Sequence, residues 1–415
     1  MVSGANFLTG VVLARGIGVR GFGVFTLAWT AVLFLNSTQI ALIIAPMMSI
    51  GPKQSADDSA SYYGCVLVHG ALFSAAGAAL LLFAMKASAW FAPQWEVQSL
   101  ALPLAAAAGA YLTQDLLRRY FYSTGRGAAV LINDAVSYLG QLALLLVMWR
   151  SARLDCASAL WIIAVTSVAG ILLGIAMLGP VIVSRGELWR VGARHWTSSK
   201  WLLASNLTLW AAGNIFFVTV PVYLGAAGAG VLRASQNLLN VTNVWFQSLE
   251  NVIPAESARR LREGGPGAML RYLRQSAALW GGATFVFVLC VSAVADPLLR
   301  HIYGSAFEGF GYVIRWSAST CIVTVLMVLP GAGLRAIEKT KPIFYANVVS
   351  ALLGLLLAVP LVKTFALRGA IGGVLLGRVV VLAMLLVSCR TGVAAVKADQ
   401  QGARDAGELL PYGNP

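Results

Sequence analysis

Long apolar segments, separated by short polar or basic gaps, follow one another along almost the whole chain. Most are longer than about 20 residues, which is the length of helix that crosses the ~30 Å hydrocarbon core of a bilayer. We count twelve, at residues 1–15, 22–49, 62–85, 97–120, 127–149, 157–183, 199–224, 228–254, 272–295, 310–333, 342–362 and 368–390. The pattern predicts an all-α polytopic membrane protein with about twelve transmembrane helices. The first segment is short for a span, because a helix over residues 1–15 would rise only about 22 Å.

The segment 228–254 carries more polar side chains than a membrane anchor needs. They recur at steps of three, four and seven, which places them on one face of a helix: Arg233, Asn237, Asn240, Gln247 and Asn251. Because polar groups are costly in lipid, this face should contact other helices or a water-filled cavity. Two interpretations remain open, hydrogen-bonded contact between helices and the wall of a cavity that binds a polar substrate.

Several patterns recur about half a chain apart. Gly23 and Gly230 each open an apolar run, and the runs end at Pro46 and Pro254, after 23 and 24 residues. The pairs Leu117-Arg118 and Leu334-Arg335, and Asn133 and Asn347, recur at offsets of 217 and 214 residues. Internal repeats are typical of transporters. We therefore predict two pseudo-symmetric six-helix bundles around a central cavity.

The boundaries of these bundles follow from the apolar segments. We expect an N-terminal bundle at 1–185, a cytoplasmic interfacial linker at 186–198, a C-terminal bundle at 199–390 and a disordered cytoplasmic tail at 391–415. With the N-terminus placed inside, 19 of the 30 Lys and Arg residues lie on the cytoplasmic side and eight on the other. The positive-inside rule then predicts that both termini are cytoplasmic.

Composition supports a membrane protein and argues against several other classes. The chain is 59% hydrophobic and 11% charged, with a mean hydropathy of +0.77. Its net charge of +14 lies in the gaps between apolar runs, which favours membrane topology over binding of nucleic acid. Five scattered cysteines and three histidines match no metal site or disulfide framework. We find no phosphate-binding loop and no catalytic motif, so we expect neither a cofactor nor an enzyme.

Ionisable residues inside the predicted spans are the candidates for function, since such groups are expensive in lipid. They are Asp115, Asp134, Arg233, Glu250, Arg315 and Arg378. Asp115 and Glu250 lie near expected cytoplasmic ends, where Asp115 can face Arg118 and Arg119, and Arg315 can reach the opposite interface. Arg233 and Arg378 are better candidates for an anion-binding cavity, because a guanidinium matches a phosphate group. Asp134 is our candidate for a carboxylate that couples transport to an ion.

Arg15 and Arg20, beside the short first segment, extend this set. They could line the exit of the same anion path, or they could be solvated loop residues. The stripe residues Asn237, Asn240 and Gln247 complete the predicted substrate contacts on that helix.

Three stretches of the chain resemble the polysaccharide transporter, or oligosaccharide flippase, family of the multidrug/oligosaccharidyl-lipid/polysaccharide exporter superfamily. The first joins Val12-Leu13-Ala14-Arg15-Gly16-Ile17-Gly18 to Gly21-Phe22-Gly23-Val24-Phe25, and the second runs from Gly230 to Pro254. The third begins at Pro297-Leu298-Leu299, includes Tyr303-Gly304 and Leu334-Arg335, and ends at Gly369-Ala370-Ile371-Gly372. Together they span nearly the whole chain.

The resemblance implies a flippase that moves polyprenyl-pyrophosphate-linked oligosaccharide from the cytoplasmic to the outer leaflet of the bacterial inner membrane. Such a protein would serve the synthesis of O-antigen, capsule or exopolysaccharide, with polysaccharide polymerase and glycosyltransferases as possible partners. Cationic cavity residues are a theme of this family, which fits Arg233 and Arg378. Some relatives carry a carboxylate in the seventh helix, where this chain has Asn206 and Asn214, and we include Asn214 among the substrate contacts.

Other functions remain open. A multidrug exporter of the same superfamily would need an acidic cavity for organic cations, whereas the central spans here offer more Arg than carboxylate. A lipid II flippase is a closer alternative, although those relatives usually have two further helices. A membrane-bound polysaccharide polymerase or ligase would usually have a large extracytoplasmic loop, which the sequence does not contain.

Overall fold

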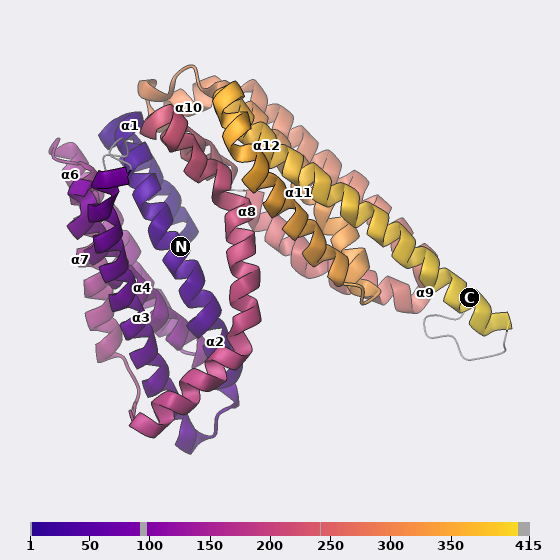
Figure 1. Cartoon of the computed structure of the whole chain (residues 1–415), viewed down its shortest axis with the longest axis horizontal. Coiled ribbons are helices and arrows are strands. Elements are labelled where there is room, and N and C mark those ends of the chain that lie inside the picture. The colour runs from indigo at the N-terminus through magenta and orange to yellow at the C-terminus, as the bar shows by residue number, and fades with distance from the viewer. Residues whose placement is uncertain (1, 92–97, 241, 406–415) are drawn as a thin grey trace. The chain divides into compact units, whose positions relative to one another are not determined.

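The computed structural model describes residues 2–91, 98–240 and 242–405, and in these residues all regular secondary structure is helical (Figure 1). The helices are α1 (Val2–Gln39), α2 (Ala45–Ile50), α3 (Ala56–Phe91), α4 (Ala101–Ser123), α5 (Gly127–Asp134), α6 (Gly140–Arg150), α7 (Cys156–Ala176), α8 (Arg185–Leu239), α9 (Thr242–Ala293), α10 (Ala295–Tyr303), α11 (Gly311–Ala336) and α12 (Lys341–Asp405). Two π-helical turns, Ile40–Ile44 and Ala135–Leu139, join α1 to α2 and α5 to α6. An apolar chain in lipid must satisfy its backbone polar groups internally, which a helix does.

Nine helical stretches of the described residues are long and apolar enough to cross a membrane. They are Val2–Lys53, Asp58–Ser88, Gln98–Ser123, Gly127–Arg150, Cys156–Ala176, Arg185–Leu239, Phe246–Ala293, Gly311–Ala336 and Lys341–Ala398. Four of them contain a backbone break, at Gly18, Gly225, Gly264–Gly265 and Ala366. These breaks divide four of the nine stretches, which brings the number of helical spans among the described residues near the twelve that the hydropathy pattern predicts. The prediction of an all-α polytopic protein is confirmed.

The backbone breaks repeat along the chain as the sequence patterns do. Gly18 (φ 69°, ψ −180°) and Gly225 (φ 73°, ψ 174°) have nearly the same dihedral angles and lie 207 residues apart. The same offset separates Gly23 from Gly230. Ala152 (φ 55°) and Ala366 (φ 52°) have positive φ angles 214 residues apart, which is the offset between Asn133 and Asn347. Positive φ is uncommon for alanine, so its recurrence at this offset supports two homologous halves.

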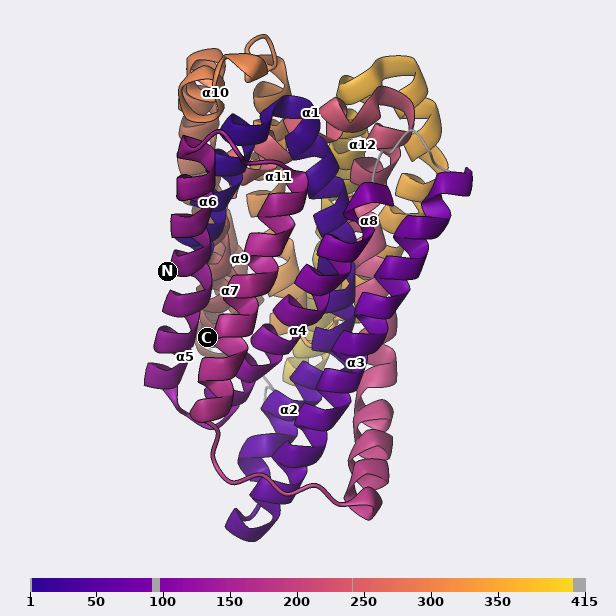
Figure 2. The ribbon, with the colours of Figure 1, turned by 90° about the vertical axis from the view of Figure 1, so that its left-hand side faces the viewer.

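The chain forms two compact units. The first comprises 1–210, 224–234 and 302–306, and the second comprises 211–223, 235–301 and 307–415. In the first unit α4 packs against both α3 and α7, and α1 packs against α6 (Figure 2). Its core includes Ile44, Met47, Tyr63, Leu116 and Phe121.

In the second unit α11 packs against both α9 and α12. Its core includes Ile253, Leu273, Val325, Leu329 and Leu385, all less than one tenth exposed. These residues come from α9, α11 and α12, and their burial holds the unit together.

A capping box fixes the start of α7. The backbone N–H of Ser158 donates to the Asp155 carboxylate over 2.7 Å, and the backbone N–H of Asp155 donates to the Ser158 hydroxyl over 2.9 Å. This arrangement satisfies backbone donors that a helix start leaves open. It follows directly on the turn at Ala152, where the preceding helix ends.

The structure shows the helical state of three regions near the predicted boundaries. The first helix extends to Gly18, so Arg15 and Arg20 lie in helix on either side of one glycine rather than in a loop. The expected linker at 186–198 is helical and continues α8, with Trp189 (83% exposed) and Trp196 (58% exposed) on its surface. Helix α12 continues to Asp405 through most of the expected disordered tail, and residues 406–415 lie outside the described residues. Helical hydrogen bonding needs no apolar sequence, and segment boundaries drawn by hydropathy therefore miss such extensions.

Candidate functional site

Arg233 lies in α8 and donates a hydrogen bond to a hydroxyl of α1. Its Nη2 is 2.9 Å from Oγ1 of Thr30, and both residues belong to the first unit. The Thr30 hydroxyl in turn donates to the Thr26 carbonyl over 2.7 Å, which orients its lone pairs. The Arg233 side chain is only partly buried. The contact therefore fixes the direction in which the guanidinium extends from α8 toward α1.

A close approach of two backbones sets this geometry. Gly23 of α1 and Gly230 of α8 meet without intervening side chains, because a Cβ on Gly230 would lie 3.0 Å from the Gly23 nitrogen. Small residues permit such crossings in membrane proteins. Arg233 lies three residues after Gly230, so it faces the same helix α1 about one turn along.

Arg378 occupies a comparable setting in the second unit. Its Nη1 donates to the hydroxyl of Thr324 and lies 3.4 Å from the carbonyl oxygen of Thr320, both on α11. Within the described residues, no Asp or Glu forms an ion pair with Arg378. The described acceptors of its hydrogen bonds are therefore neutral. Its helix is apolar and long enough to cross a membrane.

The first unit also contains a buried network of ion pairs. Nη2 of Arg118 is 2.7 Å from Asp115, and Nη1 of Arg118 is 4.0 Å from Asp134. Nε of Arg119 is 3.7 Å from Asp115, which also accepts a 3.1 Å hydrogen bond from the Asn36 side chain. The expected contact of Asp115 with both arginines is confirmed. Two carboxylates face two guanidinium groups here, so the cluster carries no formal net charge.

Amide side chains close in sequence to these residues connect three helices of the same unit. Gln114 donates to Asn133 over 2.7 Å, and Asn133 donates to the carbonyl oxygen of Gly170 over 2.6 Å. Both π-helical turns begin directly after polar residues of this region, at Gln39 and Asp134. Such turns often occur at functional sites. Asp134, the predicted coupling carboxylate, is therefore buried beside an arginine and at the start of a π-helical turn.

The other predicted residues divide between the two units. The first unit contains Arg15, Arg20, Asp134 and Arg233, and the second contains Asn214, Asn237, Asn240, Gln247 and Arg378. Along the predicted polar stripe, Arg233 and Asn237 are half-buried and Asn240 and Gln247 are exposed, while the side chain of Asn251 lies outside the described residues.

Three of the arginines have partners that sequence analysis did not identify. Arg15 is exposed and donates to the carbonyl oxygen of Ile302 over 2.7 Å, within the first unit. Arg315 forms an ion pair with Asp296 and donates to the carbonyl oxygen of Ser292 over 3.1 Å. The partner of Arg233, Thr30, lies in an apolar run, where a threonine usually bonds its own helix. No sequence signal distinguishes it from other threonines.

Arg233 and Arg378, each in its own unit, lie beside hydroxyl groups. Guanidinium groups and hydroxyls donate hydrogen bonds to anionic and hydroxylated ligands. Among the described residues, no group of three or more His, Cys, Asp and Glu side chains is placed to hold a metal ion.

Known structures resemble this fold over nearly its whole length. A multidrug resistance MATE family transporter of the MOP superfamily, in an inward-facing conformation, is 13% identical with a TM-score of 0.72 and coverage of 95% of both chains. The lipid II flippase MurJ, in an inward closed conformation, is 10% identical with a TM-score of 0.75 over 94% of this chain and 85% of its own. A MOP superfamily transporter from Pyrococcus furiosus is 12% identical, with a TM-score of 0.60 and coverage of 95% and 92%.

Comparison with protein-family models and with curated protein sequences gives no match. At these identities the structural likeness establishes the fold. The chain therefore has the multi-pass helical fold of MOP superfamily transporters.

Proposed function

We propose that this protein is a flippase for polyprenyl-pyrophosphate-linked oligosaccharide in the synthesis of cell-surface polysaccharide. The lipid would move from the cytoplasmic to the outer leaflet of a bacterial inner membrane by alternating access, without covalent chemistry. Glycosyltransferases would supply this substrate, and a polysaccharide polymerase would consume it.

The observation that carries this proposal is the environment of Arg378. It lies in a predicted membrane span, donates to Thr320 and Thr324, and has no carboxylate partner among the described residues. A charge in this position is costly unless a ligand or water meets it. An anionic ligand such as a pyrophosphate would satisfy the guanidinium, whereas an organic cation would be repelled.

Arg233 supports the same substrate class from the first unit. Its guanidinium donates to Thr30, a neutral hydroxyl, and the side chain remains partly exposed. The sugar hydroxyls and charged headgroup need polar contacts, because they cannot cross ~30 Å of hydrocarbon unaided. Asn214, Asn237, Asn240 and Gln247 are our candidates for contacts with the sugar, and Arg15 and Arg20 for the exit of the headgroup.

The structural neighbours are named as transporters, and one of them is named for a lipid-linked substrate. One is named as a lipid II flippase, and another is described by a reversed polarity of its binding pocket that suggests a different function. A third is named as a multidrug transporter. We favour the lipid-linked sugar over a cationic drug because of the arginine environments described above.

Deletion of the gene tests the proposal. We expect lipid-linked oligosaccharide to accumulate on the cytoplasmic leaflet and wild-type protein to reverse the accumulation. Arg378→Gln should fail to complement, whereas Arg368→Gln should complement, since Arg368 is an exposed arginine of the same helix that contacts the ring of Tyr312. Normal levels of lipid-linked sugar with new sensitivity to cationic drugs would instead identify a multidrug exporter. Accumulation of lipid II would identify a lipid II flippase.

A further inference from the structure

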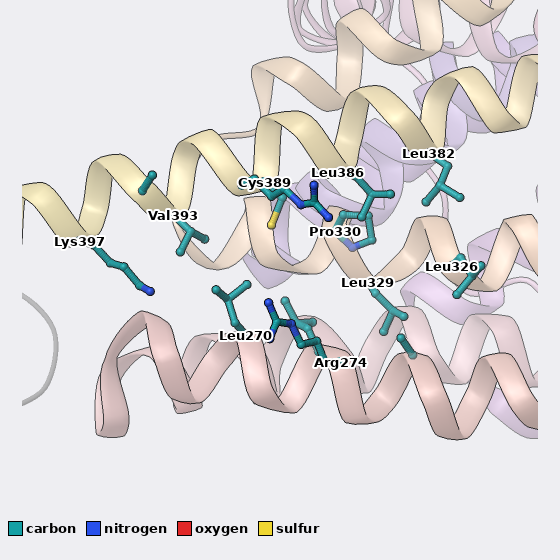
Figure 3. Close-up of a pocket in the computed structure, with 14 residues that line it drawn as sticks. Leu270, Arg274, Leu326, Leu329, Pro330, Leu382, Leu386, Cys389, Val393 and Lys397 are labelled. Carbon is teal, nitrogen blue, oxygen red and sulfur yellow. The ribbon is translucent and has the colours of Figure 1, made fainter.

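A cavity of about 400 Å³ lies between α9, α11 and α12 in the second unit, and Arg378 is not among its lining residues (Figure 3). Eleven of its 14 lining residues are apolar, among them Leu273, Leu329 and Leu386. The remaining three are Arg274, Arg390 and Lys397. The cavity thus combines an apolar wall with three positive charges, and none of its 14 described lining residues carries a carboxylate.

The three cations come from two helices and share one space. Arg390 and Lys397 are seven residues apart and therefore lie on the same face of α12. Figure 3 shows the side chains of Arg274 and Lys397 extending from α9 and α12 into the gap between these helices. Within the described residues, none of the three cations forms an ion pair with a carboxylate. Their mutual repulsion would be relieved by an anion.

The surroundings of the cavity indicate an amphipathic ligand in the membrane. Helices α9 and α12 expose large apolar side chains elsewhere, including Leu279 (65% exposed) and Val387 (62% exposed), as helices in contact with lipid do. The distribution of Lys and Arg predicts that this end of the helices is cytoplasmic. Anionic headgroups of the cytoplasmic leaflet attract basic residues at this level.

We propose that this cavity is a binding site for an anionic phospholipid of the cytoplasmic leaflet. The lipid phosphate lies among Arg274, Arg390 and Lys397, and an acyl chain lies along the leucines of α9, α11 and α12. The occupant is a resident lipid and not the transported one. The inference rests on the lining of this cavity and does not depend on the proposed substrate.

Native mass spectrometry of the purified full-length protein tests the site, with phosphatidylglycerol and phosphatidylcholine of equal chain length added in equal amounts. We expect wild type to retain phosphatidylglycerol preferentially. The triple variant Arg274→Gln/Arg390→Gln/Lys397→Gln should bind it roughly tenfold more weakly or worse, since each cation contributes to headgroup attraction.

A matched control removes the same charge from the same predicted membrane face. Arg262, Arg271 and Lys341 are exposed and do not line the cavity, and Arg271 is one helical turn from Arg274. The variant Arg262→Gln/Arg271→Gln/Lys341→Gln should keep the preference for phosphatidylglycerol. Equal losses in the two triple variants, or equal retention of both lipids by wild type, would overturn the site.

Two further measurements test whether the lipid occupies the cavity itself and whether it is a resident or a transported lipid. Ala394→Trp places a large ring in the cavity without changing charge and should also reduce retained phosphatidylglycerol; unchanged retention would refute the assignment even if the triple variant does not fold. Equimolar polyprenyl pyrophosphate should leave the bound phosphatidylglycerol in place. Displacement would assign the cavity to the transported class of lipid and overturn the proposal of a resident phospholipid.

Discussion

Gly23 and Gly230 occupy equivalent positions of the two repeats and contact each other directly. A Cβ on Gly23 would lie 3.1 Å from the Gly230 nitrogen, and a Cβ on Gly230 would lie 3.0 Å from the Gly23 nitrogen. The two residues are separated by 207 positions, as are the breaks at Gly18 and Gly225. Residues that recur at this offset therefore form both sides of a tight helix crossing.

This crossing predicts that Gly230→Ala destabilises the protein. The added methyl group meets backbone atoms of α1, including the Val19 carbonyl oxygen, and no rotamer change can relieve the overlap. We expect a melting temperature in detergent several degrees below that of wild type. Gly213→Ala is the control, because Gly213 also lies in α8 and a Cβ there has no neighbour within 4 Å. An equal or higher melting temperature for Gly230→Ala would contradict the crossing.

Arg233 should be needed for transport but not for membrane insertion. Arg233→Ala removes the guanidinium that we assign to the headgroup, so sugar export should be lost while the amount of membrane-inserted protein stays normal. Thr30→Val removes the hydroxyl that accepts its 2.9 Å hydrogen bond but keeps the charge, and should reduce export only in part. Unchanged export in Arg233→Ala would exclude this residue from the site.

Arg378 should depend on the shape of its side chain as well as its charge. Arg378→Lys keeps the charge but loses the planar guanidinium, whose Nη1 lies beside both Thr324 and Thr320 on α11. We expect export between that of wild type and that of Arg378→Gln. Complementation of the deletion strain measures this, with protein level determined by immunoblotting of membranes. Full export in Arg378→Gln would show that the charge is not used.

The Arg118 network predicts unequal effects for its two carboxylates. Asp115 is 1% exposed and 2.7 Å from Arg118, whereas Asp134 is 4.0 Å away. Asp115→Asn should therefore destabilise by about 3 kcal/mol, because it breaks a buried pair. Asp134→Asn should cost less stability and, if Asp134 couples transport to an ion, should abolish export driven by an ion gradient. Thermal unfolding and export assays on both variants separate the two roles.

The predicted topology is tested with tags at both termini. The bias of Lys and Arg toward one side predicts that each tag lies in the cytoplasm. In intact spheroplasts, protease should leave both tags uncut and should cut a tag placed in the opposite turn at Arg153. Cleavage of a terminal tag in intact spheroplasts would refute this orientation.

Hydropathy in the sequence determined the fold class. Apolar segments longer than about 20 residues must form spanning helices, because lipid offers no partner for backbone polar groups. The offsets between Gly23 and Gly230, and between Asn133 and Asn347, indicated the two halves that the recurring backbone breaks now support. The arginines in apolar segments also identified positions that need polar partners.

Only the tertiary structure determines which side chains contact the arginines. Thr30 and Thr324 accept from Arg233 and Arg378 through contacts 203 and 54 residues apart, and nothing in their local sequence marks them. The helical continuation of 186–198 and 391–405 depends on hydrogen bonding that polar residues also provide. The cavity beside Arg274 depends on where α9, α11 and α12 lie in space. Side-chain pairs and cavities arise where different segments pack together. The periodicity of polar and apolar residues within one segment does not predict these contacts.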